Sequence, residues 1–196
     1  MRTFTLMLAL LAGAPAVAEE ARDLCTDRPG LGTPACTVEK GAVVFEIGLA
    51  DWTRESDGET RTDMLQTGEA LLRFGLSNSL EVQLGWTAFG RERVRDNASG
   101  QTESRSRVGD VSLALRQNLL NPDGSGFSLA VMPYASLPVG GMPVGAGDWG
   151  AGLLLPMSQD MGSVSISATP RIDAAVDGDG KGRHLGFGAV LGLGFN

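Results

Sequence analysis

Charged and amide side chains recur at alternate positions of segments whose other positions are apolar. Residues that alternate in this way share one face of a β-strand, so we expect them to converge on one interior surface. Opposite charges on neighbouring strands would pair there and fix the strand register. Alternatively, they would line a path and select solutes by charge. The candidates for this lining are Glu46, Glu69, Arg73, Glu81, Gln83, Asp110, Arg116, Arg171 and Asp173.

Residue types that support covalent or metal chemistry are scarce in this sequence. His184 is the only histidine, which excludes His-based catalytic triads and metal sites with several histidine ligands. We therefore expect no enzyme activity, no metal and no cofactor. The formal net charge is −7 and no basic stripe is present, which argues against nucleic acid as a partner.

About eight segments of two-residue alternation must position the charged side chains. The clearest runs from Leu80 to Thr87, with apolar residues at even positions and polar or small residues at odd positions. Each segment is long enough for a tilted membrane-spanning strand of roughly 9 to 11 residues. The other segments are 43–50, 64–76, 108–119, 127–136, 149–157, 163–173 and 185–195.

The connections between these segments alternate in length. Those after the second, fourth and sixth segments are short, whereas those after the odd-numbered segments are longer and mostly polar. Tight turns on one side and long loops on the other are typical of an outer-membrane barrel, whose long loops face outside the cell. The short connections are 77–79, 121–126 and 158–162, and the long ones are 54–61, 90–107, 138–147 and 176–183.

The N-terminal part of the chain predicts export. Residues 1–18 combine a basic start at Arg2, an apolar run and the sequence Ala16-Val17-Ala18, which is typical of a cleaved secretory signal peptide. Residues 19–41 follow as a periplasmic segment in which we expect Cys25 and Cys36 to form a disulfide, because an exported chain meets an oxidising compartment. Residues 42–196 form the predicted β-barrel domain.

Alternation also fits a soluble β-barrel whose apolar face points inward and binds an apolar ligand. The second face decides between the two interpretations, because it is mostly Gly, Ser and Ala and almost lacks Lys. Such a face suits the interior of a closed membrane barrel better than a surface bathed in water. We also expect Trp52, Phe89 and Trp149, at the outer ends of strands, to form an aromatic girdle at the membrane interface.

The stretch from Ala70 to Trp86, which reads ALLRFGLSNSLEVQLGW, resembles the outer-membrane family named for the MetA pathway of phenol degradation. Supporting matches are Asp27-Arg28-Pro29-Gly30, Glu46 followed by Gly48, the run GDVSL from Gly109 to Leu113, and the run SLPVG from Ser136 to Gly140. The likeness covers about residues 27–195. It implies an outer-membrane β-barrel that transports hydrophobic or aromatic compounds.

The sequence therefore predicts an all-β, closed antiparallel transmembrane barrel of the cell outer membrane, in contact with lipid. Its expected function is that of a passive channel or transporter-like protein for small hydrophobic solutes. The alternative is a small structural or adhesive barrel, because an eight-stranded barrel has an interior just wide enough to be filled by its own side chains. The substrate and the oligomeric state stay open.

Overall fold

The computed structural model describes residues 22–28, 31–177 and 182–195, so the predicted signal peptide lies outside the described residues. Every regular element of the described part is a β-strand, which confirms the predicted all-β class. The described residues contain no helix that is long and apolar enough to cross a membrane. The strands are β1 (Val43–Ser56), β2 (Thr60–Ser77), β3 (Leu80–Asp96), β4 (Thr102–Arg107), β5 (Val111–Leu120), β6 (Phe127–Leu137), β7 (Gly150–Leu154), β8 (Met157–Asp160), β9 (Val164–Val176) and β10 (Arg183–Phe195).

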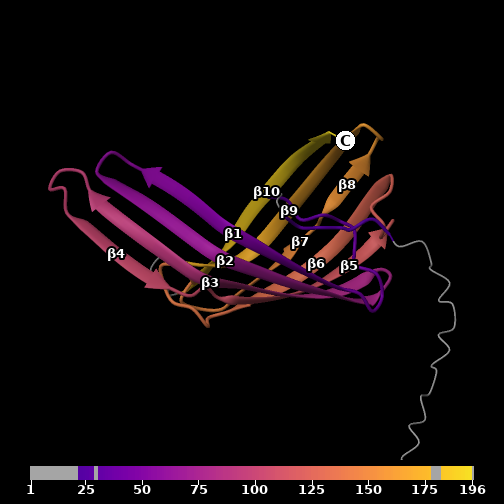
Figure 1. The fold of residues 1–196 in the computed structure, drawn as a ribbon, viewed down its shortest axis with the longest axis horizontal. Helices are drawn as coiled ribbons and strands as arrows, with labels where there is room; N and C mark the ends of the chain where they lie inside the picture. The colour runs from indigo at the N-terminus through magenta and orange to yellow at the C-terminus, as the bar shows by residue number, and fades with distance from the viewer. Residues whose placement is uncertain (1–21, 29–30, 178–181, 196) are drawn as a thin grey trace, which may run out of the picture.

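The strands form a single antiparallel sheet in the order β1-β2-β3-β5-β6-β7-β9-β10, which follows the order of the chain. β4 pairs with the outer half of β3, and β8 pairs with β6 and β9. The sheet curls, with β1 and β10 at its two ends (Figure 1). Closure of the predicted barrel would need a β1–β10 ladder, and the described residues form none.

A proline divides one of the predicted strands. The segment 149–157 becomes two strands, β7 and β8, on either side of Pro156. Proline has no N–H to give to a ladder, so regular pairing is interrupted at this position. Neighbouring backbone groups still pair here, because Ala130 N–H donates to the Pro156 carbonyl at 2.8 Å and Leu155 N–H donates to Pro170 at 3.0 Å.

The prediction of long loops at 54–61 and 90–107 is wrong. Both ranges are mostly strand, because β1, β2 and β3 extend beyond the predicted strand segments and β4 pairs with β3. The polar residues pair across these extensions, as in the Arg54–Asp63 ion pair at 2.6 Å. The hairpins project beyond the rest of the sheet (Figure 1). At the tip of the first, the Thr60 N–H donates to Asp57 and lowers the pKa of that carboxyl.

The two faces of the sheet have opposite polarity to those of a water-soluble protein. Large apolar side chains such as Phe45, Leu84 and Leu115 are exposed, whereas Arg73, Glu81 and Arg116 are fully buried. Among the described residues, the buried hydrophobic set is limited to Ala35, Val38, Ala114, Ala130 and Met132.

Gly75 marks a place where two backbones meet closely. Its carbonyl accepts the Gly41 N–H at 2.8 Å, and its own N–H donates to Ala42 at 3.1 Å. A Cβ on Gly75 would overlap the backbone carbonyl of Glu39, which cannot rotate away as a side chain could. Glycine at this position therefore lets the chain that precedes β1 lie against β2.

We predict that Gly75→Ala lowers the free energy of unfolding by about 1 to 3 kcal/mol, because the added methyl group forces two backbones apart. The measurement is denaturant unfolding of the protein folded in detergent. Gly192→Ala is the matched control, since its Cβ would meet only the rotatable hydroxyl of Ser167. Equal stability of the two variants would contradict the assigned close approach.

Candidate functional site

The chain before β1 lies on the polar face of the sheet. We call residues 22–28 and 31–41 the N-terminal segment. It lies near the short turns, because Thr37 N–H donates to the Pro122 carbonyl at 3.0 Å and Arg22 Nη1 donates to the Asn78 carbonyl at 3.0 Å. It also reaches the far side of the sheet, where the Thr169 hydroxyl of β9 donates to the Thr33 carbonyl at 3.0 Å. The segment predicted as separate from the barrel domain therefore packs against the sheet interior.

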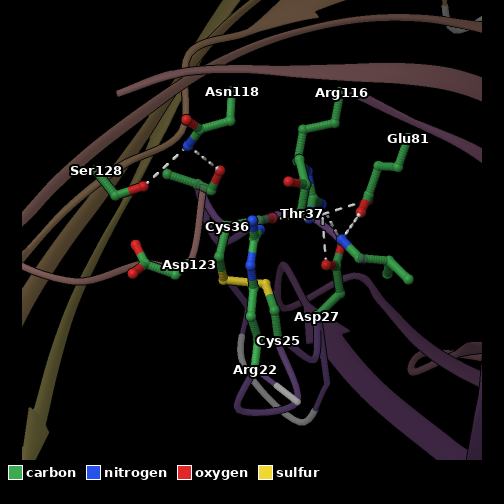
Figure 2. Close-up of a disulfide and its surroundings, with 12 residues drawn as sticks. Arg22, Cys25, Asp27, Cys36, Thr37, Glu81, Arg116, Asn118, Asp123 and Ser128 are labelled. Carbon is green, nitrogen blue, oxygen red and sulfur yellow. Dashed lines mark hydrogen bonds and ion pairs between the residues drawn. A yellow bond between two sulfur atoms is a disulfide. The ribbon is translucent and has the colours of Figure 1, made fainter. Parts of the chain in front are cut away.

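The predicted disulfide between Cys25 and Cys36 is present, with a Cα–Cα distance of 6.0 Å (Figure 2). It closes a short loop, because the two cysteines are 11 residues apart. Such a loop closure stabilises a fold by about 3 kcal/mol through the lost freedom of the unfolded chain. The bridge lies beside the buried charges, since the Cys25 carbonyl accepts from Arg73 and the Cys36 carbonyl accepts from Arg116.

Arg73 of β2 lies at the centre of the buried charges. Its guanidinium donates to Glu81 of β3 through Nε and Nη2, both at 2.9 Å. The two side chains are both fully buried. Planar two-point pairing of this kind is the strongest ion-pair geometry available to arginine. A third group, Glu46 of β1, lies 3.3 Å from Arg73 Nη1.

Asp27 of the N-terminal segment joins Arg73 to a second buried arginine. Its carboxylate lies 3.0 Å from Arg73 Nη1 and accepts from Arg116 Nη2 at 2.7 and 2.9 Å. Arg116 of β5 also lies 3.3 Å from Glu81 (Figure 2). Both arginines therefore share the carboxylates of Asp27 and Glu81. We call Asp27, Glu46, Arg73, Glu81 and Arg116 the buried charge cluster.

Other predicted lining residues surround this cluster. Gln83 Nε2 donates to Glu81 at 2.6 Å, and Glu69 pairs with Arg28 of the N-terminal segment at 3.1 Å. Glu46 accepts the backbone N–H groups of Asp27 at 3.1 Å and Arg28 at 2.9 Å. The sheet therefore binds the backbone of the segment as well as its side chains.

Three of the predicted lining residues lie apart from the cluster. Asp110 accepts from the Gly140 and Ala146 N–H groups at 3.1 and 2.8 Å, so it orders the connection between β6 and β7. Arg171 and Asp173 pair with each other on β9 at 3.1 Å. Asp173 also accepts from the Tyr134 hydroxyl of β6.

The predicted girdle residues Trp52, Phe89 and Trp149 are all exposed. Arginine side chains stack on both tryptophans. The guanidinium carbon of Arg54 lies 4.5 Å from the Trp52 ring centroid, and that of Arg183 lies 3.8 Å from the Trp149 centroid. Their position at a membrane interface stays a prediction.

A hollow of about 450 Å³ lies beside the N-terminal segment. Asp51, Gln66 and Glu69 line it from the sheet. Asp27, Arg28 and Thr33 line it from the segment. The hollow is thus bounded by both the wall and the chain that packs inside it.

Sequence reasoning missed Asp27, which holds the cluster together. It precedes the strands and shows no alternation, so strand periodicity could not assign it to the interior. The available signal was its position in the run Asp27-Arg28, which lies between the two cysteines of the sequence. Asn118 and Ser128 were also missed, although they are buried and their side chains hydrogen bond to each other at 3.1 Å.

The fold and the site define an all-β protein with an apolar exterior and a charged interior that holds its own N-terminal segment. The model of the family named for the MetA pathway of phenol degradation matches residues 26–188. The chain belongs to this family, which confirms the resemblance found in its sequence. No curated protein and no solved structure gives a significant match.

We predict that Asp27→Ala lowers the free energy of unfolding by about 3 to 5 kcal/mol, because it removes the carboxylate shared by two buried arginines. Faster amide hydrogen exchange across residues 31–41 should accompany this loss. Asp23→Ala is the matched control, since Asp23 is an exposed residue of the same segment. Unchanged exchange in the Asp27 variant would contradict the assigned role.

Proposed function

We propose that this chain forms part of an outer-membrane β-barrel that passes small solutes passively and carries out no covalent chemistry. The observation that carries the proposal is the inverted polarity of the sheet, with Arg73, Glu81 and Arg116 buried and large apolar side chains exposed. Lipid accepts an apolar exterior, whereas water would be in unfavourable contact with it. Export through the predicted signal peptide is part of the same proposal.

The N-terminal segment is the proposed plug of this barrel. It contacts β1, β2, β3 and β5 through the buried charge cluster and β9 through Thr169. A barrel interior blocked by a folded segment restricts passage to the space that the segment leaves free. The short turns that it contacts belong to the side that faces the periplasm in this type of barrel.

The hollow beside the segment is the proposed solute path. Its volume of 450 Å³ is within the range of pockets that hold small molecules. Carboxylates of Asp27, Asp51 and Glu69 line it together with the guanidinium of Arg28. Asp27 and Glu69 are paired with arginines, so Asp51 is the carboxylate that would attract cations, and we propose a preference for cations among inorganic ions.

The solute class follows from the family alone. Because the family is named for phenol degradation, we propose small aromatic or hydrophobic compounds as the solutes.

A structural or adhesive barrel is the second candidate, and one observation favours it. Arg73, Glu81 and Arg116 are fully buried and paired, so the part of the interior around them is packed. In this case the projecting hairpins β1–β2 and β3–β4 would contact external partners.

We predict a measurable conductance for the folded protein in planar bilayers. Asp51→Arg should shift the cation-to-anion permeability ratio toward anions by about twofold or more, because it adds positive charge to the path without touching the buried cluster. Glu103→Arg, on the exposed hairpin strand β4, is the control and should leave the ratio unchanged. Absence of current above background from folded protein would remove the transport function.

We also predict that the double substitution Arg73→Ala and Arg116→Ala raises the conductance, because the plug loses both arginines that bind Asp27. Heat-dependent gel mobility checks that the variant still folds. A folded variant with lower stability and unchanged conductance would favour the structural candidate.

A further inference from the structure

Positive charge gathers on the two hairpins β1–β2 and β3–β4, which project beyond the rest of the sheet (Figure 1). The chain as a whole is acidic, with a formal net charge of −7. Along β3, however, Arg91, Arg93 and Arg95 are all exposed, and Glu92 and Val94 between them are half-buried. Residues two apart in a strand share one face, so the three arginines form a row along one side of the hairpins.

The side-chain alternation of β3 shifts by one residue between Ala88 and Phe89. Exposed residues occupy even positions up to Ala88 and odd positions from Phe89 to Arg95, and Gly90 is buried. On the adjacent strand β2, Gly68 has a φ of 66°, a left-handed conformation that interrupts regular alternation, as in a β-bulge. The arginines of β3 therefore face the opposite side from the one that continuous alternation predicts.

The interior hollow shows which side the arginines occupy. Asp51 of β1 and Gln66 of β2 lie directly opposite each other, and both line this hollow. Trp52 and Leu65 form the next pair along the same ladder, so they point to the outside of the sheet. Arg91 lies opposite Leu65 and therefore shares that outer side.

Two more arginines lie on the outer side. Asp63 of β2 is opposite Arg93 on one side and Arg54 on the other. Arg61 is opposite Arg95. Asp63 pairs with Arg54 at 2.6 Å and with Arg61 at 2.8 Å, whereas the three arginines of β3 have no ion-pair partner within the described part of the chain. We call Arg54, Arg61, Arg91, Arg93 and Arg95 the outer arginine patch.

The patch begins where the apolar exterior ends. Trp52 and Leu65 are exposed and lie in the same row as Arg91. Phe89 is also exposed and precedes Arg91 by two residues, a distance of about 7 Å along a strand. Arg54 contacts both surfaces, since its guanidinium carbon lies 4.5 Å from the Trp52 ring centroid. In a membrane, the layer directly beyond the hydrocarbon is that of the lipid headgroups.

We propose that the outer arginine patch binds the phosphate groups of anionic lipids in the leaflet around the hairpins. This inference rests on the proposed function, because it takes the apolar side chains next to the patch to contact membrane hydrocarbon. A guanidinium donates two parallel hydrogen bonds to a phosphate, and basic clusters near a membrane surface attract anionic lipids. Ser104 and Ser106 of β4 lie opposite Arg93 and Arg91 and add exposed hydroxyl donors.

A soluble acidic partner fits this surface less well. The hairpin tips, which such a partner would meet first, carry Asp57 and Asp96 directly after β1 and at the end of β3. Their carboxylates accept N–H groups of their own turns, from Thr60 and Ser99, both at 2.7 Å. The arginines lie instead along the outer side of the sheet, next to apolar residues that favour lipid over water.

The first test measures lipid binding to the full chain, folded in detergent, by native mass spectrometry with added phosphatidic acid or phosphatidylcholine. We expect phosphatidic acid to be retained in preference, because its phosphate carries no choline. The double substitution Arg91→Gln and Arg93→Gln should weaken this binding by about tenfold. Arg105→Gln with Arg107→Gln is the matched control, since it removes the same charge from the rows of the same hairpin that face the interior.

Equal weakening in both double variants, or equal retention of the two lipids, would overturn the proposal. If the protein then still conducts in planar bilayers, the proposed function stands without the patch. Binding of heparin that depends on Arg91 and Arg93, with no retention of phosphatidic acid, would assign the surface to a soluble polyanion and overturn the proposal as well. A chain that stays folded in water without detergent would overturn the proposed function itself.

The second test measures the depth of the patch in vesicles of phosphatidylcholine and phosphatidic acid. A nitroxide label is attached through Arg93→Cys, because both native cysteines are protected in their disulfide. We expect this label at the headgroups, with a label attached through Phe89→Cys deeper and one attached through Ser99→Cys, in the hairpin turn, in water. Equal access of a water-soluble relaxation agent to the labels at Arg93→Cys and Ser99→Cys would overturn the proposal.

Discussion

The structure depends on the need of buried charges for partners within the protein. Arg73, Glu81 and Arg116 lie on the polar face of the sheet with no exposure to solvent, and their desolvation is costly unless each is paired. Neighbouring strands supply part of the pairing, through Glu81 and Glu46. The N-terminal segment supplies Asp27, which contacts both arginines. The charges that fix strand register therefore also hold the segment inside the sheet.

The sheet accommodates this segment through small residues as well as through charge. Gly75 allows the chain before β1 to approach β2 at backbone distance. Gly32 lies near Val190 of β10, so the described part of the segment extends to the opposite end of the sheet. The disulfide then limits the conformations of the loop that carries Asp27. Close packing, charge pairing and a covalent bridge thus act on one short stretch of chain.

The interior of the curled sheet has two parts that differ in packing. The part around Arg73 and Arg116 is packed, and the part around Asp51 and Glu69 is hollow. A passive path and a structural filling can therefore coexist along one interior. Under the proposed function, the hollow would select the solutes, and the buried charge cluster would hold the segment in place.

The sequence by itself determined the class of the fold, the polarity of its faces and the disulfide, because strand alternation and cysteine spacing are local properties. It placed Glu46, Arg73, Glu81 and Arg116 on one face for the same reason. Tertiary structure decided that these side chains converge on Asp27, since a residue outside the strands carries no periodic signal. It also decided that 54–61 and 90–107 continue the strands. Pairing between distant segments, which no local pattern encodes, sets both outcomes.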